Sequence, residues 1–194
     1  MPLSLVPPMR LATAADGVAL AELVNFAGEG LPLYLWNRLS EPGQDPWALG
    51  AERQAKMAAD GRIVVVDEGA GVVAALTGYP VHEEKPLPED MPPMWRVLQE
   101  LENQVVGTWY LNVLATYPRA RGRGLGAQLI KHAEKIARFD KLSGVSIIVA
   151  DENVGALRLY ERLGYAEIDR KPMIKETWDN PSDNWILLKK DLAA

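Results

Sequence analysis

Cysteine is absent from this 194-residue sequence, which excludes disulfide bonds, a cysteine nucleophile and cysteine-ligated zinc or iron–sulfur centres. Histidine is scarce as well: His82 and His132 stand alone, without carboxylates at a metal-ligand spacing, so we expect no metal site. No apolar run approaches the roughly 20 residues that cross a bilayer. The first residues lack the basic segment and apolar core of a signal peptide. We therefore expect a cytoplasmic protein without a membrane partner.

Positive charge is also in short supply. The chain has 21 Lys and Arg against 26 Asp and Glu, a net charge of −5 at pH 7. Because nucleic-acid binders gain most of their affinity by neutralising phosphates, we expect no nucleic-acid partner. The composition is otherwise that of a globular protein, with 48% hydrophobic and 24% charged residues. The length predicts one domain over residues 1–194.

The spacing of apolar residues divides the chain into a helical beginning and a mixed remainder. The predicted helices of the beginning cover residues 14–27, 33–39 and 46–59. Two β-branched runs, 63–66 and 72–76, then flank a glycine-containing turn and predict a hairpin. Residues 80–93 hold five of the 14 prolines and are expected to form a loop.

Strands and helices alternate in the second half. The predicted elements are a short helix over 97–105, a strand over 109–116, a helix over 124–139, a strand over 145–150, a helix over 153–163 and a strand over 185–188. The 145–150 run is apolar throughout, as in a strand covered on both faces. We predict a mixed α/β fold with helices on both faces of the sheet. The strand over 185–188 is expected at an edge, where it would pair with a second subunit in a homodimer.

A turn rich in arginine and glycine, residues 119–126, lies between a predicted strand and a predicted helix. Gly122, Gly124 and Gly126 permit a close backbone approach and positive φ. The first amides of the following helix are unsatisfied donors at the positive end of its dipole, which a pyrophosphate would satisfy. Residues 114–141 hold seven Lys and Arg against two Asp and Glu. This local excess of positive charge favours a polyanion site, and a solvated surface turn is the alternative.

The known phosphate loops do not fit this turn, because it lacks a Gly-Lys-Ser/Thr ending and a complete Gly-x-Gly-x-x-Gly pattern. Arg121-Gly122-Arg123-Gly124-Leu125-Gly126 instead matches Arg/Gln-x-x-Gly-x-Gly/Ala, the acyl-CoA signature of the GNAT family of N-acetyltransferases. The segment 151–165, with Asn153, Tyr160 and Leu-Gly-Tyr at its end, is similar to that family's second signature. The chain thus resembles the GNAT family over about 109–188, whereas residues 1–60 match only in their helical character.

The resemblance implies a mostly antiparallel central sheet of six or seven strands flanked by helices on both faces, with an acyl-CoA-binding half at about 109–190. It implies transfer of an acetyl group from acetyl-CoA to a primary amine of a small molecule or peptide, by direct attack in a ternary complex. A catalytically inactive acyl-CoA-binding sensor of the same fold is the alternative, and a longer acyl chain is a third possibility.

The same resemblance implies roles for individual residues. The amides of 121–126 would bind the pyrophosphate, and the main chain of Leu114 and Thr116 would pair with pantetheine, with an N–H near Leu114 polarising the thioester oxygen. Asn153 would hold the pantetheine arm. Tyr160, seven residues on and therefore near the same helix face, would protonate the departing thiolate. A tyrosine packed in the core is the alternative for Tyr160.

The base that deprotonates the amine is left open among Glu83, Glu84, Asn112 and Asp151, and Asn112 suits only the positioning of a water molecule. Residues 80–104 hold six Asp and Glu against two Lys and Arg, which favours a cationic amine if this segment faces the acceptor. The alternative is a solvated loop. Two aromatic residues, Trp36 and Trp95, are candidates for the acceptor wall, with packing in the core or at its rim as their alternative.

Overall fold

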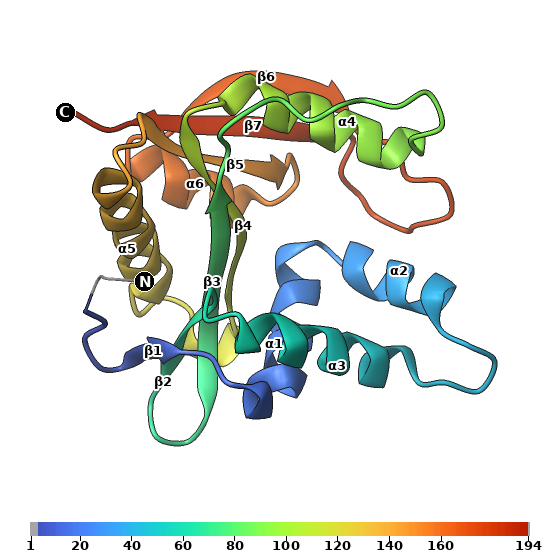
Figure 1. Ribbon diagram of the computed structural model, residues 1–194, viewed down its shortest axis with the longest axis horizontal. Helices are drawn as coiled ribbons and strands as arrows, with labels where there is room; N and C mark the ends of the chain where they lie inside the picture. Colours follow the sequence, from blue (N-terminus) through green and yellow to red (C-terminus); the bar gives the residue numbers. More distant parts are fainter. Residues whose placement is uncertain (1–3, 194) are drawn as a thin grey trace. The chain divides into compact units, whose positions relative to one another are not determined.

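The computed structural model describes residues 4–193, in which seven strands form one mixed sheet flanked by six α-helices (Figure 1). The strand order is β1-β2-β3-β4-β5-β7-β6. The pairs β1–β2, β2–β3, β5–β7 and β7–β6 are antiparallel, whereas β4 and β5 run parallel. The predicted fold class, a mixed and mostly antiparallel sheet with flanking helices, is confirmed.

The chain divides into two compact units. One contains the described residues up to Gly78 together with Val113–Ile130, and the other contains Tyr79–Asn112 together with the described residues from Lys131 onward. Strands β3 (Val72–Pro80) and β4 (Thr108–Thr116) and helix α5 (Leu125–Phe139) each contribute residues to both units. The single domain over residues 1–194 stays a prediction.

The first unit carries the N-terminal helices beside the hairpin. Its elements are β1 (Met9–Leu11), α1 (Gly17–Ala27), α2 (Leu31–Leu39), α3 (Pro46–Ala59) and β2 (Val64–Asp67), with the beginning of β3. Helices α1 and α3 lie side by side (Figure 1), and they approach so closely that a Cβ on Gly17 would lie 2.6 Å from the Ala51 carbonyl oxygen. Their apolar faces cover the hairpin strands, with Leu20, Leu23 and Val65 fully buried.

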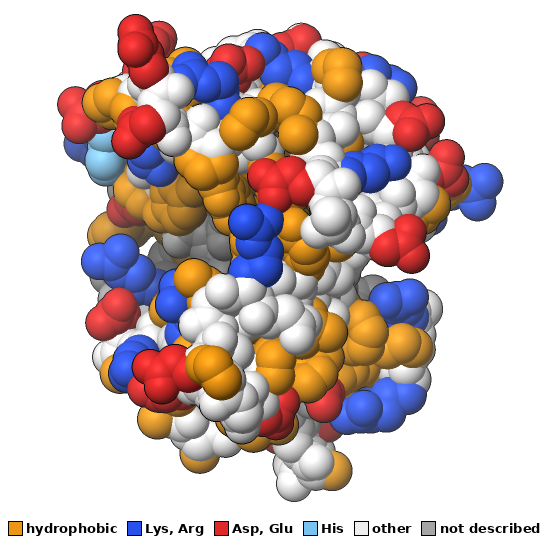
Figure 2. Space-filling view, turned by 90° about the vertical axis from the view of Figure 1, so that its right-hand side faces the viewer, with side chains coloured by type: hydrophobic (Ala, Val, Ile, Leu, Met, Phe, Trp, Pro, Cys, Tyr) orange, Lys and Arg blue, Asp and Glu red, His pale blue; other side chains and the backbone are white. Residues whose placement is uncertain are grey.

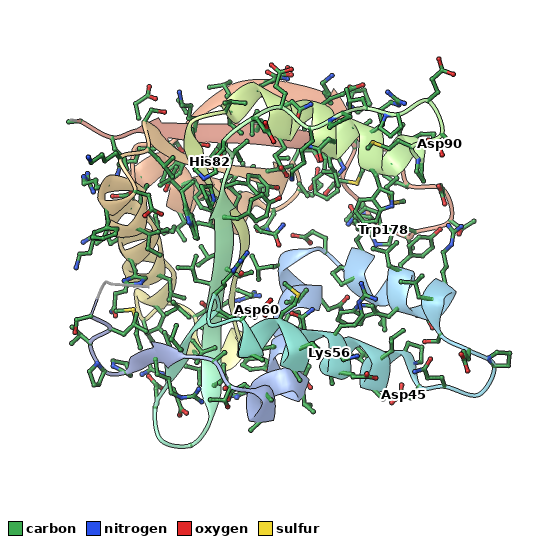
Figure 3. All side chains as sticks on the ribbon, in the orientation of Figure 1. Asp45, Lys56, Asp60, His82, Asp90 and Trp178 are labelled. Atoms are coloured by element: carbon green, nitrogen blue, oxygen red, sulfur yellow. The ribbon has the colours of Figure 1, made fainter. Side chains whose placement is uncertain are left out.

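Local signals set the helix ends in this unit. Asp45 begins α3 by accepting a hydrogen bond from the Trp47 amide at 3.0 Å, with Pro46 in the first turn, and Asp60 follows its last residue (Figure 3). The first predicted helix begins as a short 3₁₀ turn, Ala14–Asp16, before α1. Strand β1 was not predicted, because only three residues after the prolines at 7 and 8 pair with β2.

The second unit contains α4 (Pro93–Glu102), β5 (Gly144–Ala150), α6 (Val154–Arg162), β6 (Ala166–Pro172) and β7 (Asn184–Asp191), with parts of β3, β4 and α5. Helix α4 lies along β6 and β7 (Figure 1). It begins at Pro93, the last residue of the stretch predicted as a loop, because a proline is well tolerated in a first turn. Gly164, with φ of +87°, follows α6 as predicted.

The prediction that Trp185–Leu188 lies at a sheet edge is wrong. Strand β7 pairs with β5 along the whole of β5, from Gly144–Asp191 to Ala150–Trp185, and with β6 on its other side. The edge is formed by β6, whose residues are charged and exposed. Such residues suit an unpaired edge, but they lack the alternation of apolar and polar residues by which a strand is predicted. A homodimer built by adding a strand to Trp185–Leu188 therefore loses its basis.

Among residues 4–193, no helix combines the length and the apolar character needed to cross a lipid bilayer. On the face shown in Figure 2, acidic, basic and hydrophobic side chains are intermingled. Neither sign of charge dominates this face.

Candidate functional site

The glycine turn of the first unit joins the end of β4 to the beginning of α5. After a 3₁₀ turn at Pro118–Ala120, Gly122 and Gly124 have φ of +76° and +77°, in the left-handed region. A Cβ built on either glycine would meet no atom within 4 Å. The backbone angle, and not crowding, is therefore what requires glycine at both positions.

The backbone amides of this turn point to no partner within the protein. From Gly122 to Ala127, no amide donates a hydrogen bond to another residue in the described part of the chain, and the helical pattern begins with Gln128 donating to Gly124 at 3.0 Å. These donors lie at the positive end of the 15-residue helix α5. The turn is thus suited to an anionic group, as a run of amides before a helix is in other anion sites.

Each arginine of the turn has a partner within the first unit. The Arg119 guanidinium lies 4.3 Å from the centre of the Tyr117 ring, and Arg121 Nε donates to the Thr116 carbonyl at 3.2 Å. Arg123 forms two hydrogen bonds to the carboxylate of Glu68 in the β2–β3 turn. That pairing lowers the pKa of Glu68, so a phosphate has to compete with a charged carboxylate for Arg123.

Tyr117 anchors the turn to the core of the first unit. Its amide donates to the Val73 carbonyl at 2.9 Å, and its hydroxyl donates to Glu22 Oε2 at 2.5 Å. Burial, together with the hydrogen bond to Glu22, raises the pKa of Tyr117. Consecutive residues do not indicate this role of Tyr117, because its partners come from α1 and β3.

Side chains alternate along β4. Asn112 is exposed and Leu114 and Thr116 are half-buried, whereas Val113 and Ala115 between them are buried. The alternation places the three predicted residues on one face of the strand. Pairing of β4 with β5 covers Thr108–Tyr110 and Gly144–Ser146, and it ends two residues before Asn112.

Tyr160 lies on α6 in the interior of the second unit. It is 2% exposed, and its ring meets that of Tyr165 edge-on at 5.5 Å. Burial raises the pKa of Tyr160, which keeps its hydroxyl protonated but also makes it a weaker acid. No hydrogen bond to this hydroxyl exists among the described residues of its unit. The surroundings fit core packing and proton donation alike.

The other predicted polar residues of the second unit differ in how far they are engaged. The Asn153 Oδ1 atom accepts from the Ala156 amide at 3.1 Å and so caps α6. Asp151 accepts from the Asp183 amide at 3.0 Å and from Asn184 Nδ2 at 2.8 Å, which holds the beginning of β7. Burial alone would raise the pKa of Asp151, but these hydrogen bonds outweigh it and lower the pKa, making this carboxylate a weaker base.

Glu83 and Glu84 are exposed in the segment after β3, without hydrogen-bond partners among the described residues. His82 precedes them on the same segment (Figure 3). No group of three or more His, Cys, Asp or Glu able to hold a metal occurs in residues 4–193.

The two tryptophans expected at the acceptor wall have different surroundings. Trp36 is 4% exposed, meets Trp47 edge-on at 5.9 Å and lies where a Cβ on Gly50 would come within 2.5 Å of its ring. It is therefore a core residue between α2 and α3. Trp95, on α4, is 39% exposed and can contact a ligand.

A polar cluster of the second unit was missed by the sequence analysis. The Glu102 carboxylate, at the end of α4, accepts hydrogen bonds from the Tyr79 hydroxyl at 2.6 Å and from Lys85 Nζ at 2.5 Å. The Tyr110 ring lies 5.4 Å from the Tyr79 ring. Burial, reinforced by the negative charge of Glu102, raises the pKa of both tyrosines, so both remain neutral. We refer to Tyr79, Lys85, Glu102 and Tyr110 as the Glu102 cluster.

Comparison with known proteins agrees with the fold. The model of the acetyltransferase (GNAT) family matches residues 31–165. N-alpha-acetyltransferase 40 of Saccharomyces cerevisiae is 29% identical over 143 residues, which are 70% of this chain and 47% of that protein. The chain therefore spans about half the length of this curated relative.

Two solved structures show the same fold at low identity. One is of an acetyltransferase and has a TM-score of 0.61 at 21% identity, over 98% of this chain and 100% of the other. The second is of an acetyltransferase from Salmonella typhimurium with acetyl-CoA, and it has a TM-score of 0.59 at 17% identity, over 95% and 93% of the two chains.

Proposed function

The chain belongs to the acetyltransferase (GNAT) family, and from this membership we propose that it transfers an acetyl group from acetyl-CoA to a primary amine of a peptide or small molecule. The observation that carries the proposal is the glycine turn, where consecutive backbone amides from Gly122 to Ala127 have no acceptor in the described chain. Two left-handed glycines hold this backbone in place. The curated relative is named for acetylating α-amino groups, which adds protein N-termini to the acceptors worth testing.

The coenzyme would be held by main-chain groups. The amides of 122–126 would bind its pyrophosphate, whereas the Arg121 amide, which the sequence analysis included, already donates to the Pro118 carbonyl at 3.2 Å. The Leu114 and Thr116 main chain would pair with pantetheine as an added strand, and Asn153 would hold the same arm. Pairing of β4 with β5 ends at Tyr110–Ser146, which leaves this part of β4 without a β5 partner in the ladder and supports the proposed pairing.

Transfer then needs a carbonyl polariser and a proton donor. An N–H near Leu114 would stabilise the negative charge that develops on the thioester oxygen. The neutral amine attacks the carbonyl carbon, the C–N bond forms and the C–S bond breaks. Tyr160 would give its proton to the departing sulfur, since its hydroxyl is neutral and carries a proton; burial, which raises its pKa, also makes it a weaker acid.

The proton lost by the amine would pass to water held by Asn112, which is exposed on β4. On the acceptor side, Glu83, Glu84 and Trp95 are accessible and would attract and line a cationic substrate, whereas buried Trp36 has no part in this proposal. Asp151 is excluded from the base role by its hydrogen bonds and lowered pKa.

An acyl-CoA sensor without catalysis is the second candidate. It is favoured by one observation: Glu83 and Glu84 have no hydrogen-bond partner among the described residues that would position either as a general base, and Asp151 is held by Asp183 and Asn184. Titration calorimetry with acetyl-CoA, followed by a thiol-release assay over peptides and small amines, separates the candidates. Saturable binding with thiol release supports the enzyme, binding without release by any amine supports the sensor, and no binding at millimolar acetyl-CoA refutes both.

A further inference from the structure

The Glu102 cluster has the chemistry of a site for an alkylammonium ion. We propose that it recognises the ammonium group of the acceptor before transfer, and that Lys85 occupies this position in the free protein as a resident ammonium that the acceptor displaces. This inference deepens the proposed function and rests on it for the identity of the ligand.

The first argument is the way the Lys85 ammonium is bound. Its Nζ atom lies 2.5 Å from Glu102 Oε1 and 4.9 Å from the centre of the Tyr79 ring. A carboxylate on one side and an aromatic face on the other form the arrangement that binds organic ammonium ions in proteins. The side chain of Glu102 is only 10% exposed, so a cation at this position compensates for the water that the buried carboxylate has lost.

The second argument is accessibility. The Lys85 side chain is 50% exposed, and it comes from the proline-rich segment 81–92 rather than from a helix or strand. Two backbone hydrogen bonds to Asn103, at 2.9 Å each, hold Lys85 against the end of α4. Release of these few polar contacts would free the ammonium position without disturbing the apolar core.

The third argument is proximity to the proposed acid. Tyr110 lies against Tyr79 and interacts electrostatically with both Glu102 and Tyr160. All these residues belong to the second unit. An ammonium at Glu102 therefore lies in the same unit as the tyrosine proposed to protonate the departing sulfur.

The test compares binding of n-butylammonium chloride with that of n-butanol, its neutral analogue, without coenzyme. The readout is the chemical-shift change of backbone amides over 79–105 in the isotope-labelled full chain. Substitution Lys85→Met removes the resident ammonium but keeps an apolar stem. We expect it to bind butylammonium about tenfold more tightly than the parent protein, because a tethered competitor has an effective concentration in the millimolar range. Butanol binding should not change.

Two further variants complete the test. Lys85→Met combined with Glu102→Gln should lose the gain, because the carboxylate is gone. Asn103→Ala leaves all four residues of the Glu102 cluster intact, and it should bind butylammonium about threefold more tightly because Lys85 is held less firmly. Asn103→Ala therefore tests the proposal by itself if Lys85→Met folds poorly.

The proposal is overturned if neither Lys85→Met nor Asn103→Ala gains affinity for butylammonium, or if the gain persists in the double variant. Acetyl-CoA calorimetry on the parent protein, measured separately, shows whether the coenzyme assignment has failed instead.

Discussion

Replacing Gly124 by alanine tests the glycine turn, where the new Cβ is strained by the backbone angle alone. Gly124 has φ of +77°, and a Cβ there would meet no atom within 4 Å. A left-handed conformation costs an alanine roughly 1–2 kcal/mol more than a glycine. If the turn keeps its shape, the free energy of unfolding falls by that amount. If the turn relaxes, the amides that we assign to the pyrophosphate move, and the same free energy corresponds to about a tenfold weaker acetyl-CoA complex.

Gly61 offers a matched control in the same unit. It has φ of +67°, follows α3, and a Cβ there would likewise meet no atom within 4 Å. Gly61→Ala should lower stability to a similar extent without changing acetyl-CoA affinity. Denaturant titration measures the first quantity and calorimetry the second. Should Gly124→Ala bind acetyl-CoA as tightly as Gly61→Ala does, with both at the parental affinity, the assignment of the turn to phosphate is wrong.

Three other substitutions test separate parts of the structure. Tyr160→Phe should keep acetyl-CoA affinity but lower kcat at least about tenfold, since one proton donor is lost; an unchanged kcat removes Tyr160 from the mechanism. Glu68→Gln should release Arg123 and so tighten acetyl-CoA binding about twofold to fivefold at low salt. If the gain in affinity persists at high salt, it does not have this electrostatic origin. Hydrogen bonds from Arg10 lower the pKa of Asp16 from 3.8 to about 2. Asp16→Asn should therefore lower the free energy of unfolding at pH 7 by about 1–2 kcal/mol, a value that already allows for screening of the partly exposed Arg10 by solvent. That stabilisation is present above pH 3.8 and disappears as the pH falls through about 2, so the two unfolding free energies should converge there; a difference that does not depend on pH refutes the ion pair as its cause.

Helices and strands whose apolar residues recur at a regular spacing could be predicted from the sequence. Strands that exist only because another strand pairs with them could not. The long amphipathic helix α5 and the apolar strand β5 have unambiguous patterns. Strand β6 reads Ala-Glu-Ile-Asp-Arg-Lys-Pro and exists because β7 pairs with it, and β1 has only three residues. Placing Trp185–Leu188 at an edge was wrong for the same reason, since sequence order does not show that β7 lies between β5 and β6.

The candidate site divides in the same way. The glycine turn is local, so both its position between strand and helix and its need for positive φ could be predicted from consecutive residues. The Glu102 cluster contains residues from β3, the segment 81–92, α4 and β4. No residue spacing along the chain predicts that these side chains meet. The pairing of Arg123 with Glu68, 55 residues apart, was hidden for the same reason.

The position of β7 in the sheet also limits the order in which the strands can pair during translation. Strand β5 and strand β6 are successive strands in the chain, yet both lie against β7, which is translated after them. Until residues 184–191 have left the exit tunnel, β6 has no strand to pair with, and β5 has only the short parallel contact with β4. During this interval the nascent chain exposes two strands with unpaired edges. Unpaired edges promote aggregation, so this is the stage at which chaperones would be most needed.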